Sequence, residues 1–144
     1  MPYDANLVLA DDTLDWGYDN LVSYGTPDST DKNAGGFVIL DIKETGAKGM
    51  AAILIIDAAG SSSGNQLTVV LQASDSSTFA SGIQTLCNFE VAGVAHGTIL
   101  GNEAPCTVIR RFATEKRYVR IVASTTGDFY TVWCLLSPYP FYKL

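Results

Sequence analysis

Eight short runs of apolar residues follow one another along the chain, most of them rich in β-branched or aromatic residues and bounded by turn-forming residues. Such runs are typical of β-strands, because branched and aromatic side chains fit a pleated, half-buried surface. The spacing that marks an amphipathic helix is nowhere sustained over about 11 residues. The predicted strands are residues 6–10, 37–42, 50–57, 67–72, 83–91, 106–112, 117–123 and 129–136.

This strand pattern predicts an all-β fold, an antiparallel β-sandwich or a jelly-roll-like arrangement with long loops. A parallel α/β sheet needs crossover helices, for which the intervals between the predicted strands leave no room. The 144 residues fit a single β-sandwich domain, 1–144. It comprises an acidic N-terminal strand and loop at 1–36, a second long loop at 92–104 and an aromatic C-terminal tail at 138–144.

The composition limits the partners of the chain. Only 17% of the residues are charged and 47% are apolar, so the chain is not intrinsically disordered, and we expect a partner to cover part of its apolar surface. The net charge of −6 argues against non-specific nucleic-acid binding, which needs clustered Lys and Arg. The longest apolar runs are about 8 residues, too short to cross a membrane.

The cysteines predict a reducing environment. Cys87, Cys106 and Cys134 lie in or beside apolar runs, and three thiols cannot all pair with one another. We therefore predict free, buried and reduced thiols. The first residues show no basic stretch followed by an apolar core, so no signal peptide is expected.

No set of residues predicts an enzyme. Residues 60–64 (GSSSG) match the nucleophile motif G-x-S-x-G, and Asp75 and His96 follow in the order found in α/β-hydrolases. That motif requires a helix after the serine, whereas 67–72 is a predicted strand, so a Gly- and Ser-rich hairpin loop is the better interpretation. Since the chain has one histidine and no evident pair of carboxylates, we expect no catalytic site.

We expect no metal or cofactor either. His96 lies nine residues after Cys87 and ten before Cys106, a spacing that matches no zinc-ligand pattern. The polar residues of 31–35 alternate loosely as in a calcium loop, but Ile42 stands where the bidentate glutamate belongs. The segment is better interpreted as a solvated turn.

A basic cluster and several aromatic residues are candidates for an interface. The basic residues flank a predicted hairpin at 113–115, and two interpretations stay open. They form either an exposed sheet face balanced by Glu115 and the acidic loops, or a docking surface for an acidic partner, including the 11–36 segment of another copy. The cluster consists of Arg110, Arg111, Lys116, Arg117 and Arg120. The candidate interface residues are Trp16, Tyr18, Tyr24, Arg110, Arg117, Arg120, Tyr139, Phe141 and Tyr142.

Three stretches carry a resemblance to a known family: 4–17 (DANLVLADDTLDWG), 67–82 (LTVVLQASDSSTFASG) and 115–137 (EKRYVRIVASTTGDFYTVWCLLS). Within them, Q-x-S-D-x-S-x-F at 72–79 precedes K-R-Y-x-R at 116–120. In this order and spacing the chain resembles the Bbp16-like family of small capsid cement, or decoration, proteins of tailed bacteriophages.

The resemblance implies a jelly-roll-like sandwich that acts as a homo-oligomer, a dimer or a trimer, on the outer surface of a virion. There it would bind the major capsid protein of an HK97-type icosahedral shell, bridge neighbouring subunits and stabilise the mature, DNA-filled head. The resemblance implies no nucleic-acid or membrane partner. A carbohydrate-binding β-sandwich for host attachment stays open as the alternative, because jelly rolls also occur in lectins.

Overall fold

The computed structural model describes residues 8–10, 39–42, 47–60, 64–93 and 102–138, and these contain strands and connections but no helix. The all-β prediction is therefore confirmed. The strands are β1 (Val8–Ala10), β2 (Leu40–Asp41), β3 (Ala47–Ala59), β4 (Gln66–Ser74), β5 (Gln84–Ala92), β6 (Cys106–Thr114), β7 (Tyr118–Thr125) and β8 (Phe129–Pro138).

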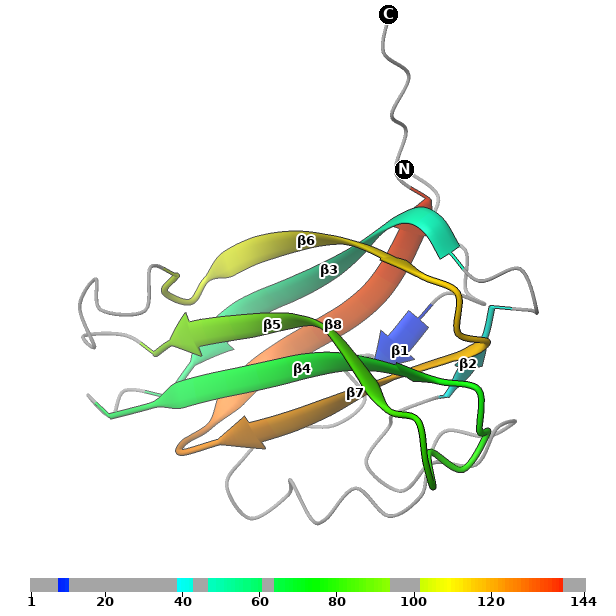
Figure 1. Ribbon diagram of the computed structural model, residues 1–144. Helices are drawn as coiled ribbons and strands as arrows, with labels where there is room; N and C mark the ends of the chain where they lie inside the picture. The colour runs from blue at the N-terminus through cyan, green and yellow to red at the C-terminus, as the bar shows by residue number, and fades with distance from the viewer. Residues whose placement is uncertain (1–7, 11–38, 43–46, 61–63, 94–101, 139–144) are drawn as a thin grey trace, which may run out of the picture.

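The strands form two four-stranded sheets that lie face to face (Figure 1). Sheet A has the order β1-β8-β3-β6, and sheet B has the order β2-β7-β4-β5. The antiparallel pairs β1–β8, β2–β7, β3–β6 and β4–β5 are nested, as in a long hairpin that has been folded over into two sheets. This nesting is the strand order of a jelly roll, so the predicted sandwich is confirmed together with its jelly-roll-like connectivity.

Alternation of apolar and polar residues fixes the register of sheet B. Leu67, Val69 and Leu71 of β4 are buried, while the residues between them are half-buried. The register pairs Leu71 with Ile121 and Val69 with Ala123 of β7, which are also buried. A shift by one residue would turn these side chains to the outer face, so burial specifies the pairing.

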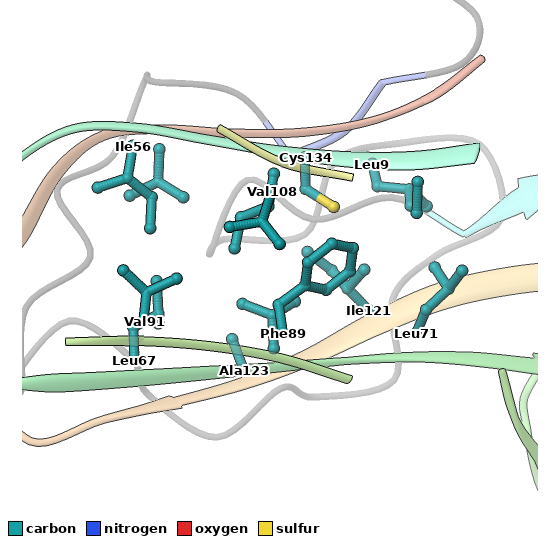
Figure 2. Packing of buried hydrophobic residues seen from close by; sticks show 14 of the residues in the cluster. Leu9, Ile56, Leu67, Leu71, Phe89, Val91, Val108, Ile121, Ala123 and Cys134 are labelled. Atoms are coloured by element: carbon teal, nitrogen blue, oxygen red, sulfur yellow. The ribbon is translucent and has the colours of Figure 1, made fainter. Parts of the chain in front are cut away.

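One hydrophobic core fills the space between the sheets and takes side chains from all eight described strands. Figure 2 shows Ile56, Val108 and Cys134 of sheet A opposite Phe89 and Val91 of sheet B. Burial of this apolar area is the main stabilising contribution to such a fold.

Backbone and side-chain contacts close the core along the edge where β5 and β6 meet. The Thr114 hydroxyl donates a hydrogen bond to Oε1 of Gln84 at 3.1 Å. The amide of Ala92 donates to the carbonyl of Asn102, and that of Ala104 donates to the carbonyl of Ala92. The two ends of the predicted 92–104 loop are thus held together; residues 94–101 of that loop lie outside the described residues.

Both predicted hairpins are wrong. The chain passes from β3 in sheet A to β4 in sheet B through 60–64, and from β6 in sheet A to β7 in sheet B through 115–117. Each segment therefore connects two sheets rather than two paired strands. The physical reason is that each of these strands finds its partners far along the chain, as nested pairing requires.

Strand limits also differ from the predicted ones. β3 exceeds the prediction for 50–57 by several residues, and β8 continues through Pro138, which pairs with Met50. The predicted tail at 138–144 therefore begins one residue too early. Proline is tolerated there because it ends the strand, where one missing N–H group disrupts little of the ladder.

Candidate interaction surface

The outer faces of the two sheets differ in chemistry. On sheet B, the side chains that point away from the core are mostly polar, such as Gln72 of β4, Arg120 and Ser124 of β7, and Glu90 of β5. A polar outer face of this kind is usual for a sheet with one face in solvent. We call this surface face B.

On sheet A, the outward side chains are mostly apolar. The register places Ile53 between Leu135 and Ile109, and the next row of the same face contains Trp133, Ile55 and Thr107. Ile109 is 52% exposed, whereas Leu135 is 3% exposed although it points away from the core cluster. The apolar residues of this surface, here called face A, are Ala51, Ile53, Ile55, Ile109, Trp133 and Leu135.

Charged residues stand at the two ends of face A. Asp57 lies two residues beyond Ile55 on β3 and is exposed. Arg111 lies two residues beyond Ile109 on β6, pairs in register with Ala51 and is exposed. Because side chains alternate along a strand, both project from the same face as the apolar rows. Face A is thus an apolar band with an acid at one end and a base at the other.

Of the basic cluster, Arg111 lies on face A, whereas Lys116 and Arg117 lie at sheet B and contact acids of the same chain. Arg117 donates two hydrogen bonds to Asp41, from Nε at 3.0 Å and from Nη2 at 2.9 Å, and so joins β7 to β2. Lys116 Nζ forms an ion pair with Asp75 at 2.6 Å, and the amide of Arg117 also donates to Asp75. The hydrogen bond from Lys116 lowers the pKa of the Asp75 carboxyl below its ordinary value.

Arg120 joins β7 to the connection that follows β4. Its Nε donates to Oε1 of Gln72 at 3.1 Å, and its guanidinium lies 4.2 Å from the ring centroid of Phe79. Burial lowers the pKa of Arg120, since desolvation disfavours its charged form. Phe79 is buried with a φ of 53°, a conformation that is rare outside glycine.

These contacts bring together the two motifs that carry the family resemblance. Residues 72–79 supply Gln72, Asp75 and Phe79, and residues 116–120 supply the basic partners. The motif residues therefore hold one end of sheet B together. Sequence spacing could not predict these pairs, because their members lie 41 to 48 residues apart.

The candidate interface residues fall into two groups. Arg110 lies on β6, the edge strand of sheet A, with its guanidinium 5.9 Å from the ring centroid of Phe89, while Arg117 and Arg120 have the partners described above. Among the described residues, Asp41 pairs with Arg117 and Asp75 pairs with Lys116, and the use of these arginines for docking stays a prediction. The aromatic candidates Trp16, Tyr18, Tyr24, Tyr139, Phe141 and Tyr142 lie outside the described residues.

Sequence reasoning missed face A, although a signal for it exists. The predicted strands at 50–57 and 129–136 are apolar at nearly every position instead of alternating. Continuous apolar runs indicate strands that are covered on both faces. In a two-sheet sandwich the opposite sheet covers only one of these faces, although Ala51 and Leu135 on the outer face are also buried in this chain.

The described residues contain no group of three or more His, Cys, Asp and Glu side chains placed to hold a metal ion. Nor does any helix in that part of the chain have the length and apolar character needed to cross a membrane. His96 and residues 61–63 of the GSSSG motif lie outside the described residues. Strand β4 begins at Gln66, so a strand follows this motif.

The three cysteines are free thiols in chemically unreactive surroundings. Cys134 is buried, whereas Cys87 and Cys106 are half-buried, so the prediction of burial holds fully only for Cys134. Desolvation raises the pKa of Cys87 to about 11 and raises those of the other two thiols. The reactive thiolate is therefore disfavoured at neutral pH.

One shallow pocket lies at an end of face B, with a volume of about 210 Å³. Its lining contains neither an aromatic ring nor a carboxylate, so it offers a sugar no stacking platform. The lining residues are Gln66, Thr68, Ser124, Thr125 and Thr126.

Comparison with protein families, with curated proteins and with solved structures finds no match to this chain. Its function must therefore be argued from its own surfaces and from the two motifs. Of these surfaces, face A is the one whose chemistry calls for a partner.

Proposed function

We propose that the chain is a non-catalytic capsid cement protein of a tailed bacteriophage. It binds the outer surface of an HK97-type shell, bridges neighbouring major capsid subunits and stabilises the mature, DNA-filled head. The observation that carries the proposal is face A, because an apolar band on the outside of a complete sandwich provides contact area rather than chemistry. The resemblance of 72–79 and 116–120 to the cement-protein family is the reason for proposing a phage capsid as the partner.

The mechanism is ordinary linkage between binding and stability. A ligand stabilises the state to which it binds, so a protein that binds the expanded shell better than the unexpanded one opposes its disruption. On a symmetric lattice, weak individual contacts add up to strong retention, since many copies are held at high effective concentration.

The pairs at the end of sheet B support this role. Arg117 with Asp41, and Arg120 with Gln72 and Phe79, fix the connections around β7 before any partner binds. A surface that is already ordered loses less conformational entropy on binding. The jelly roll thus serves as a rigid scaffold.

The test uses shells assembled from the major capsid protein of such a phage. Purified protein is mixed with expanded shells, the shells are sedimented, and both fractions are read on a gel. We expect the protein to sediment at a fixed ratio near that of the capsid protein, and the decorated shells to withstand higher temperature. Protein that stays in the supernatant would refute the proposal, and binding to a glycan array would then favour the carbohydrate-binding alternative.

Matched variants show whether face A takes part. Ile109→Asp places a charge in the apolar band, and Val70→Asp places the same charge on face B, where Val70 is half-buried. If face A contributes to assembly, Ile109→Asp reduces co-sedimentation and Val70→Asp does so much less. Equal loss from both variants would point to a general effect of added negative charge.

A further inference from the structure

Strand β5 is the edge of sheet B, and its hydrogen bonds show which backbone groups face away from the sheet. The amide of Gly93 donates to the carbonyl of Asn65, on the side of β4. The amide of Ala92 donates to the carbonyl of Asn102, on the opposite side. Backbone groups alternate between the two sides of an antiparallel strand, and the pairing of 87–92 with β4 is regular. The even-numbered residues of this stretch therefore face away from β4.

Asn88 presents unpaired backbone groups on this free side. Ala92 is already bonded to the 102–104 segment, and the carbonyl of Glu90 accepts from Nδ2 of Asn102 at 3.2 Å. Among the described residues, nothing pairs with the N–H and C=O groups of Asn88 or with the N–H group of Glu90. In Figure 1, no other described strand lies across this side of β5. Unpaired groups on a strand edge can accept a further strand.

Arg110 directs a positive charge toward the same edge. It occupies an inward position of β6, in line with the buried Val108 and Phe112, and it is itself half-buried. Its guanidinium lies 5.9 Å from the ring centroid of Phe89, and Nη1 donates to the carbonyl of Ile109 at 3.2 Å. No acid in the described part of the chain pairs with it. A guanidinium has five N–H donors, so most of them remain for a ligand.

The free edge and the arginine select the same ligand. All strand pairs of the two described sheets are antiparallel. A strand added to β5 in this way places one residue opposite Phe89, with its side chain pointing inward, toward Arg110. A half-buried positive charge disfavours an apolar or basic side chain there, whereas a carboxylate would form charge-assisted hydrogen bonds with it. Inward charges also protect edge strands from indiscriminate pairing.

We propose that an extended segment of the shell subunit adds to the free side of β5 as a fifth strand of sheet B, and that an aspartate or glutamate opposite Phe89 binds Arg110. The inference rests on the proposed function for the source of the segment, but not for the chemistry that recognises it. Backbone pairing is limited to Asn88 and Glu90, so a single contact is weak. Many copies on a lattice make such contacts effective.

The probe is a capped peptide, Ser-Val-Thr-Glu-Thr-Val-Ser, added to the isotope-labelled full chain and followed by amide chemical shifts in NMR. Titration to about 5 mM makes millimolar dissociation constants measurable. We expect the largest shifts at Asn88 and Glu90, and binding at least about fivefold weaker when glutamine replaces the glutamate of the peptide. Arg110→Gln should remove this difference between the peptides. Lys116→Gln is the matched control, because it removes a positive charge that pairs with Asp75 instead.

Backbone methylation of the peptide tests strand pairing without altering the protein. In the antiparallel register, the two threonines lie opposite Asn88 and Glu90 and direct their N–H groups toward β5, whereas the N–H group of the glutamate points away. N-methylation of both threonines should therefore abolish binding. N-methylation of the glutamate alone should change the dissociation constant by less than about threefold, because no hydrogen bond to β5 is lost.

Three results would overturn the proposal. The first is no binding of the glutamate peptide, and the second is equal binding of the glutamate and glutamine peptides. The third is slow hydrogen exchange of the Asn88 amide in the free chain. Protection that grows with protein concentration would assign the edge to a second copy, and protection independent of concentration would assign it to the chain itself.

Failure here is distinguishable from failure of the proposed function. If the peptides do not bind while the protein still sediments with shells, the cement function stands and this edge has no part in it. If the glutamate peptide binds selectively while the protein stays in the supernatant of the shells, recognition of an acidic strand stands and the shell is excluded as its source.

Discussion

Asn65 is the residue on which three connections between strands converge. It is 3% exposed, its Nδ2 donates to the carbonyl of Gly60 at 3.0 Å, and its own carbonyl accepts from the amide of Gly93. A Cβ atom at Gly93 or Gly127 would overlap the Asn65 side chain. The side chain thus fills the space between the ends of both sheets, where glycine alone leaves room.

We expect Asn65→Ala to lower the free energy of unfolding by about 1–3 kcal/mol, because it leaves a carbonyl without its donor. Gly127→Ala should cost at least as much, since the carboxamide would have to move. Gly64→Ala is the matched control, because nothing lies within 4 Å of a Cβ atom there. Urea unfolding of the three variants measures these losses of stability. Equal unfolding midpoints for all three would contradict the role given to Asn65.

Asp75 links stability to pH. The hydrogen bond from Lys116 lowers the pKa of Asp75, so the folded chain binds this proton less readily than the unfolded chain does. Its stabilising contribution is present above the ordinary pKa of 3.8 and is lost as the pH falls through the lowered pKa. We therefore expect Asp75→Asn to flatten the decline of the urea midpoint between about pH 5 and pH 2.

The matched control for this pH effect is Asp128→Asn, which also removes one exposed negative charge. The two variants have the same net charge, so a general charge effect would alter both curves alike. Only a specific contribution of the Asp75–Lys116 pair alters one of them.

At the scale of elements, Arg120 holds the connection between β4 and β5 against β7. It stacks on Phe79 and donates to Gln72, and it is partly desolvated. We expect Arg120→Ala to destabilise the fold by about 1–2 kcal/mol, from the lost cation–π contact and hydrogen bond. Lys116→Ala removes an exposed pair and should cost less than about 1 kcal/mol. Thermal unfolding of the two variants compares them, and a larger effect for Lys116→Ala would contradict the argument.

Sequence patterns predicted which segments are strands but not which sheet each strand joins. The strands at 67–72 and 106–112 could be predicted because alternation and branched residues reflect local preferences, which are visible in a single sequence. The wrong hairpins at 60–64 and 113–115 arose because a short connection between two strands says nothing about whether they pair. Face A was missed for a related reason, since its apolar rows come from three strands that meet only in the folded sheet.

At the scale of the whole molecule, nested pairing makes almost every strand contact non-local. Among the described strands, only β4 and β5 are neighbours both in the chain and in a sheet; β1 pairs with β8, β2 with β7 and β3 with β6. Such contacts require loss of chain entropy before the burial of apolar surface stabilises them, so β-sandwiches typically fold in milliseconds to seconds. The core therefore reaches its full burial only when the first and last described strands have met.

That closure can be tested through Leu9. β1 has three residues at the edge of sheet A, yet Leu9 is fully buried in the core formed by both sheets. We expect Leu9→Ala to lower the free energy of unfolding by about 2–5 kcal/mol, as for a buried leucine in a cooperative core. Ile109→Ala on face A should cost less than about 1 kcal/mol, because that side chain is largely exposed.

The slope of the unfolding free energy against urea concentration shows whether β1 unfolds together with the other strands. If β1 unfolds together with the rest, Leu9→Ala shifts the urea midpoint and leaves the slope unchanged, because the same surface becomes exposed. A smaller slope would mean that β1 detaches before the other strands, so that the cooperative unit is the sandwich without its first strand. Equal effects of Leu9→Ala and Ile109→Ala would refute the closure argument, since burial is what distinguishes the two positions.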